Sequence, residues 1–112
     1  MSNYRRGADL ERTVRQHLAE QGAWPIIRSA GSKGVIDLIA SREGVTHAFQ
    51  VKRECWPGPA ERRALAAVTA STGWCCWSVR WEPRQALQFR LVDCDATLRR
   101  AAFGNVALCA NP

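Results

Sequence analysis

Polar side chains interrupt two apolar runs in the first half of the chain. Asp37 lies in the middle of Val-Ile-Asp-Leu-Ile-Ala, and Gln50 and Lys52 lie thirteen and fifteen positions later, on either side of a valine. An unpaired carboxylate is costly to bury, so Asp37 needs a partner. Because side chains alternate along a strand, pairing of the two runs as a hairpin would place Asp37 beside Gln50 and Lys52.

These residue types favour divalent-metal chemistry. A carboxylate and an amide oxygen are hard ligands that suit Mg²⁺. A lysine beside the metal can orient or deprotonate an attacking water, or offset charge that builds at phosphorus. The spacing alone leaves a structural alternative open, in which Asp37 and Lys52 form a buried ion pair and Gln50 is an ordinary solvent-facing residue.

Two helices and five strands are expected to position these residues. Apolar residues at helical spacing predict a first helix over 3–21, and Pro59 with Gly73 bounds a second helix over 59–72. The order α-β-β-β-α-β-β predicts a single domain, residues 1–112, of the α/β (α+β) class, with a mixed β-sheet flanked by helices. The strands are expected at 24–29, 35–40, 46–52, 74–81 and 87–92, followed by a weak helix at 96–103.

The charge of the chain favours a polyanionic partner. Sixteen Lys and Arg against ten Asp and Glu give a net charge of +6, and fourteen of the sixteen cations are arginine, whose planar fork suits phosphate. Charge alone does not separate a nucleic-acid-binding protein from a merely basic soluble one. Since neither a signal-peptide pattern nor an apolar stretch of spanning length occurs, we expect a cytoplasmic protein without a membrane partner.

The five cysteines indicate no metal site. They form neither C-x-x-C pairs nor a zinc-like spacing with histidine, so we expect reduced, mostly buried thiols.

Three motifs in the first half of the chain resemble one nuclease family. They are Tyr-Arg-Arg-Gly-Ala-Asp-Leu-Glu-Arg from residue 4, Arg-Ser-Ala-Gly-Ser-Lys-Gly from residue 28, and Asp37 with Gln-Val-Lys at 50–52. In this order they resemble the archaeal-type Holliday junction resolvases of the PD-(D/E)xK superfamily, in a D…QxK variant. The resemblance implies a restriction-endonuclease-like fold and the resolution of four-way DNA junctions by metal-dependent phosphodiester hydrolysis.

The resemblance also implies roles for individual residues. Glu11, Asp37 and Gln50 would form the metal site, joined by the backbone carbonyl of Val51, and Lys52 would be the catalytic lysine. Mg²⁺ is the implied cofactor, and Mn²⁺ would substitute for it. The residues implied to contact DNA are Arg5, Arg6, Arg12, Arg28, Ser29, Ser32 and Lys33.

Several of these residues also have other interpretations. Glu11 could pair with Arg15 one helical turn away, and Arg5 and Arg6 could belong to a frayed basic N-terminus. Gln50 stands where the family has a glutamate, and an amide keeps the oxygen but loses the charge. This departure leaves two other functions open: an Mrr-like restriction or repair nuclease acting on duplex DNA, and a catalytically inactive DNA-structure-binding protein.

A resolvase of this size is expected to act as a homodimer. A four-way junction is resolved by paired, symmetric nicks in strands of like polarity, and one chain carries one Asp37 cluster, so a twofold dimer supplies the two sites. Apolar residues in excess of the needs of a small core predict the interface, together with the tail at 95–112. They are Trp74, Trp77, Trp81, Leu98 and Phe103.

Overall fold

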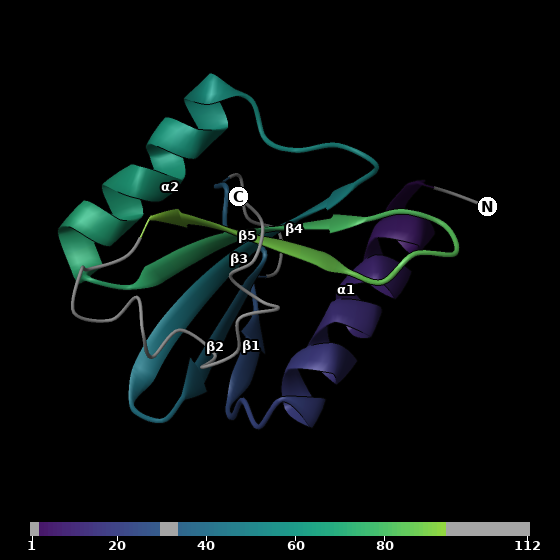
Figure 1. Cartoon of the computed structure of the whole chain (residues 1–112), viewed down its shortest axis with the longest axis horizontal. Helices are drawn as coiled ribbons and strands as arrows, with labels where there is room; N and C mark the ends of the chain where they lie inside the picture. Colours follow the sequence, from purple (N-terminus) through teal and green to yellow (C-terminus); the bar gives the residue numbers. More distant parts are fainter. Residues whose placement is uncertain (1–2, 30–33, 94–112) are drawn as a thin grey trace.

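The sheet and its two helices form in the expected order. The computed structural model describes residues 3–29 and 34–93, and it places α1 and α2 on opposite faces of a twisted five-stranded sheet (Figure 1). The expected mixed α+β architecture is confirmed. The elements are α1 (Asn3–Glu20), β1 (Ile26–Arg28), β2 (Leu38–Arg42), β3 (Val45–Arg53), α2 (Pro59–Thr72), β4 (Cys75–Trp81) and β5 (Gln88–Asp93).

The strands lie in the sheet in chain order, β1-β2-β3-β4-β5. The pairs β1·β2, β2·β3 and β4·β5 are antiparallel, whereas β3 and β4 are parallel. A parallel pair needs a crossover connection, and α2 provides it. This crossover places the start of α2 close to the end of β3, where the polar residues of β3 lie.

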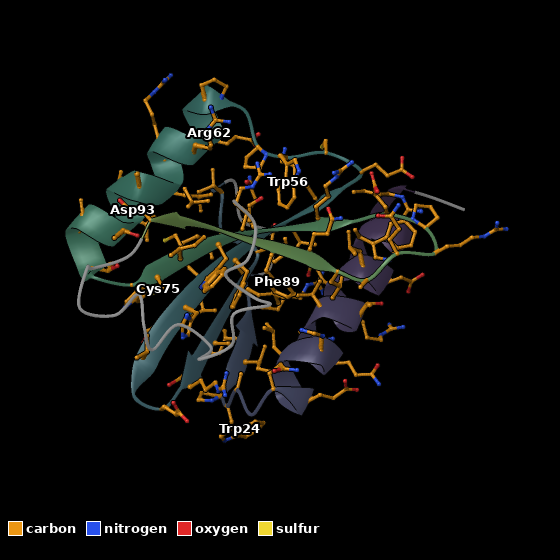
Figure 2. All side chains as sticks on the ribbon, in the orientation of Figure 1. Trp24, Trp56, Arg62, Cys75, Phe89 and Asp93 are labelled. Carbon is orange, nitrogen blue, oxygen red and sulfur yellow. The ribbon has the colours of Figure 1, made fainter. Side chains whose placement is uncertain are left out.

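Alternation along β3 separates two cores. On one face, Leu10, Val14 and Leu18 of α1 pack in a cluster with Phe49, and Phe89 contributes from β5 (Figure 2). On the other face, beneath α2, a smaller cluster contains Ala48, Leu65 and Cys76. Gln50 has the same parity as Ala48 in β3, so its side chain projects toward α2.

The observed boundaries differ from the expected ones mainly around Asp37. The second helix is confirmed at Pro59–Thr72, and the first ends at Glu20 rather than residue 21. Strand β2 begins at Leu38 instead of residue 35, so Asp37 lies immediately before the strand and not in its middle. The helix expected at 96–103 and the tail at 95–112 lie outside the described residues.

Trp77 does not supply a subunit interface. It lies in the interior strand β4 and is fully buried, with its indole N–H donating to His47 Nδ1 at 3.1 Å. Its assignment to the dimer face was therefore wrong, because α1 covers that face of the sheet. Trp74 and Trp81 are half-buried, and Leu98 and Phe103 lie outside the described residues.

The expectation of reduced thiols fails at Cys75. This residue is disulfide-bonded, whereas Cys55 and Cys76 are free. Spacing in the sequence could not reveal the bond, because pairing depends on which cysteines the fold brings together. Among the described residues, no helix is long and apolar enough to cross a membrane.

Candidate functional site

The Asp37 side chain acts as a hydrogen-bond acceptor in place of a backbone carbonyl, at the point where β2 meets β3. Its N–H donates to the Phe49 carbonyl at 2.8 Å, and its own carbonyl accepts from the Ser29 N–H at 2.9 Å, so its backbone joins both neighbouring segments. Its side chain then extends the pairing, since Oδ2 accepts from the Val51 N–H at 2.8 Å. The other carboxylate oxygen, Oδ1, bonds to no residue within 3–29 or 34–93.

The surroundings of Asp37 favour its neutral form. Burial raises the pKa of its carboxyl above the ordinary value, and the carboxylates of Glu11 and Glu61 raise it further. The Val51 N–H and the Lys52 ammonium lower this pKa without cancelling the rise. A cation bound beside Asp37 would reverse the balance by favouring the carboxylate.

Gln50 and Lys52 meet Asp37 at the same corner of the sheet. Asp37 bonds the Phe49 carbonyl and the Val51 N–H, so it lies beside the stretch of β3 that contains Gln50. The Gln50 side chain is 5% exposed, and its amide N–H donates to Glu61 Oε2 at 2.9 Å. Its Oε1 is buried and bonds to nothing in the described part of the chain.

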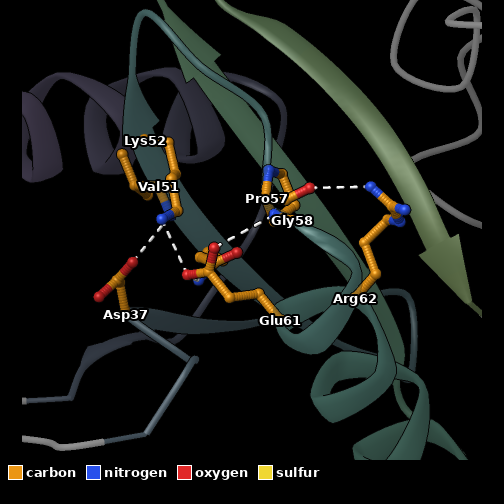
Figure 3. Close-up of polar contacts among 8 residues, drawn as sticks. Asp37, Val51, Lys52, Pro57, Gly58, Glu61 and Arg62 are labelled. Atoms are coloured by element: carbon orange, nitrogen blue, oxygen red, sulfur yellow. Dashed lines mark hydrogen bonds and ion pairs between the residues drawn. The ribbon is translucent and has the colours of Figure 1, made fainter.

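Lys52 is paired with α2 and not with Asp37. Its Nζ lies 2.8 Å from Glu61 Oε2 (Figure 3), and this is the ion pair of Lys52 within the described residues. Together with the burial of Gln50, this arrangement contradicts the alternative of a simple Asp37–Lys52 pair beside a solvent-facing glutamine.

Glu61 is the site residue that sequence reasoning missed. It lies in the first turn of α2, and its Oε1 accepts from the Gly58 N–H at 3.3 Å at the start of the helix. The hydrogen bond from Lys52 holds the pKa of Glu61 below its ordinary value. In the sequence, its position after Gly-Pro-Ala predicts only the start of a helix. The signal that could have found it was the crossover itself, which brings the first turn of α2 back over β3.

Glu11 and Arg28 join α1 to β1 beside the same corner. Arg28 Nε lies 2.6 Å from Glu11 Oε1, so Glu11 pairs across elements instead of with Arg15 on its own helix. Arg28 immediately precedes Ser29, whose N–H is bonded to the backbone of Asp37. The structure therefore brings Glu11, Arg28 and Ser29 together with Asp37.

The other residues expected to contact DNA are not brought to the Asp37 corner by any contact among the described residues. Arg12 is 70% exposed and paired with Asp9 at 3.4 Å, and it lines a hollow together with Trp24 and Ile26. The backbones of Arg5 and Arg6 belong to α1, and their side chains lie outside what the structure describes. Ser32 and Lys33 also lie outside the described residues.

Comparison with known proteins identifies relatives of both the sequence and the fold. Residues 2–56 match the family model "Archaeal holliday junction resolvase (hjc)". The crossover junction endodeoxyribonuclease Hjc of Methanocaldococcus jannaschii is 49% identical over 49 residues, which are 44% of this chain and 35% of that protein. The chain thus spans about a third of the length of this curated relative.

The structural comparison extends beyond the matched sequence. The solved structure of Archaeoglobus fulgidus Hjc, a Holliday junction resolvase, superposes with a TM-score of 0.68 at 24% identity, covering 78% of this chain and 73% of that one. The family match contains Glu11, Asp37, Gln50 and Lys52, whereas Glu61 follows it. Residues 2–56 thus match the archaeal Holliday junction resolvase family model, and the fold of the chain is that of Archaeoglobus fulgidus Hjc.

Proposed function

We propose that this protein is a metal-dependent, structure-selective endodeoxyribonuclease that resolves four-way DNA junctions by phosphodiester hydrolysis. The family match and the fold support this assignment. The observation that carries it is the convergence of Asp37, Gln50 and Lys52 at one corner, with the buried Oε1 of Gln50 lacking a partner among the described residues. A buried acceptor without a donor is unusual in a native fold and suits a cation ligand.

The donor set of this corner fits Mg²⁺, for which Mn²⁺ would substitute. Asp37 Oδ1 and Gln50 Oε1 are hard oxygen donors, and Glu11 adds a second carboxyl group nearby. The N–H of Val51 faces Asp37, and the N–H and C=O of one strand residue point to the same side, so the Val51 carbonyl is available on that side as well. No three His, Cys, Asp or Glu side chains within the described ranges form a ready-made metal cluster, which makes the amide and carbonyl oxygens essential to the proposal.

A divalent cation at this site would activate water and polarise the scissile phosphate. The residues of the chain do the remaining work. Lys52, held by Glu61, can orient the nucleophile or offset charge at the phosphorus. Arg28 can contact the phosphate from its position beside Glu11. The further DNA contacts proposed are Arg5, Arg6, Arg12, Ser29, Ser32 and Lys33.

We further propose that two copies act together as a homodimer and introduce paired, symmetric nicks. One chain contributes one Asp37 corner, and twofold symmetry would present two equivalent corners to the two strands of a junction. Selectivity would come from junction shape and phosphate contacts, since the sequence contains nothing that resembles a major-groove reading motif. The protein would act on DNA in the cytoplasm.

Cleavage of a synthetic four-way junction, compared with duplexes of the same arm sequences in Mg²⁺, tests the function. Cutting confined to the junction is expected. Equal cutting of the duplexes would instead favour a restriction or repair nuclease, the function that Gln50 left open. Tight junction binding without cutting in either Mg²⁺ or Mn²⁺ would identify a DNA-structure-binding protein.

A further inference from the structure

The bond between Gln50 and Glu61 fixes the orientation of a buried amide. A carboxylate has no hydrogen to donate, so Glu61 Oε2 can face only the NH₂ group of Gln50, as the 2.9 Å contact places it. The amide oxygen must therefore lie on the other side. This oxygen is the buried Oε1 that has no partner within 3–29 or 34–93.

The two oxygens of Glu61 have separate tasks. Oε1 accepts from the Gly58 N–H at the start of α2, whereas Oε2 receives both Gln50 at 2.9 Å and Lys52 at 2.8 Å. Capping the helix requires only the first oxygen. The second brings a negative charge from α2 to the end of β3, where Gln50 itself carries none.

We infer that Glu61 is the positioning residue of the metal site. By accepting from the Gln50 amide N–H, it leaves the carbonyl oxygen of Gln50 available to a divalent cation. It also supplies from α2 the carboxylate charge that Gln50 lacks. This inference rests on the proposed function, because it needs a cation at the Asp37 corner. In this account one carboxylate and one amide form a working pair, and the chain carries the carboxylate on the helix. Exchanging the two groups should preserve the pair.

Mn²⁺ binding by the protein without DNA tests the inference directly. Electron paramagnetic resonance of free Mn²⁺ reports affinity without reference to cleavage. Glu61→Gln keeps an oxygen that can cap Gly58, but it removes the charge and allows the Gln50 amide to flip. We expect its Mn²⁺ affinity to fall by about 10- to 100-fold, the usual loss when a group that orients a metal ligand is removed.

The exchanged double variant, Gln50→Glu with Glu61→Gln, separates this role from helix capping. It should recover Mn²⁺ affinity to within a few-fold of wild type, because a carboxylate on β3 then faces an amide on α2. Glu20→Gln is the matched control, since it removes an exposed carboxylate at the far end of α1, about 14 Å along the helix from Glu11. It should bind Mn²⁺ like wild type.

The outcomes distinguish failure of the inference from failure of the proposed function. Wild-type affinity in Glu61→Gln, or an exchanged pair no better than Glu61→Gln, would overturn the role of Glu61 while loss of binding in Asp37→Asn still upheld the metal site. Absence of Mn²⁺ binding by the wild-type protein would overturn both. Circular dichroism checks folding, and if Glu61→Gln is unfolded, Glu61→Asp replaces it. The aspartate keeps the charge but withdraws it by one methylene, and it should weaken Mn²⁺ binding severalfold.

Discussion

The Asp37 carboxyl does two things that conflict in the absence of metal. It substitutes for a backbone acceptor by bonding the Val51 N–H, and it places an ionisable group in a half-buried position near the carboxylates of Glu11 and Glu61. Its raised pKa records the conflict, because burial and the two carboxylates outweigh the hydrogen bond and Lys52. A bound cation would remove this conflict, because the Asp37 carboxylate would then be a metal ligand.

Asp37→Asn should therefore make the metal-free protein more stable at neutral pH. The pKa of Asp37 is higher in the folded state than its ordinary value of 3.8, so the folded protein binds this proton more tightly. Protonation of Asp37 therefore stabilises the fold at low pH, and this stabilisation is lost as pH rises through the folded pKa. The asparagine oxygen can still accept the Val51 N–H but carries no charge. Thermal unfolding in EDTA should show a melting temperature above that of wild type at pH 7, with the difference vanishing below pH 3.8. Equal melting temperatures at both pH values would contradict this interpretation.

Arg28→Ala tests the neighbouring ion pair in the reaction itself. If Arg28 contacts the cleaved phosphate, its removal should slow single-turnover cleavage more than it weakens junction binding. Arg84→Ala is the matched control, because Arg84 is exposed in the turn between β4 and β5 and is not among the proposed DNA contacts. Loss of affinity with unchanged single-turnover cleavage would place Arg28 outside the reacting centre.

The elements position these residues through one crossover and one hairpin. The hairpin of β2 and β3 sets Asp37 against Phe49 and Val51, beside Gln50, and the crossover brings Glu61 over the end of β3. The hairpin was predictable because apolar runs and a Glu-Gly turn mark it, and the bounds of α2 followed from Pro59 and Gly73. The start of β2 was not predictable, because Asp37 bonds to β3 through its side chain, and no residue pattern reveals such a bond. The contact of Glu61 depends on packing between distant segments.

A buried histidine should give the central strands a pH dependence. His47 lies in β3 and accepts the Trp77 N–H, and burial, with a smaller contribution from Arg42, lowers the pKa of His47 from 6.5 to about 4. The unfolded chain therefore takes up this proton first, so stability is full above pH 6.5 and falls as pH drops toward about 4. His47→Gln can still accept from Trp77 but does not titrate. Urea unfolding of the variant should lose part of the decline between these pH values, and an unchanged decline would assign it to other groups.

As a whole molecule, the chain combines a small sheet scaffold with a strong positive charge. The net charge of +6 is carried almost entirely by arginine, and each phosphate that these side chains neutralise releases counterions. We expect the logarithm of junction affinity to fall steeply and linearly with the logarithm of salt concentration. Fluorescence anisotropy at several salt concentrations measures this slope, and a flat dependence would argue against phosphate contacts as the main source of affinity.

The proposed assembly also belongs to this scale. Light scattering at micromolar concentration should find a dimer, and end-labelled junctions should show nicks at symmetric positions on two strands. A monomer both free and on junction DNA would contradict the resolvase mechanism and leave a simple nickase. The symmetry of a four-way junction predicts that two active sites are needed. The sequence did not predict the surface that joins two subunits, because Trp77, which was expected at that surface, is buried in the core.

Junction cleavage by Asp37→Asn, measured beside junction binding, tests the central claim most directly. The substitution removes the anionic oxygen that the proposed cation needs, but it removes none of the arginines that are proposed to contact DNA. We predict that cleavage in Mg²⁺ is abolished while junction affinity stays close to that of wild type. Cleavage within severalfold of wild type would show that the chemistry does not take place at the Asp37 corner.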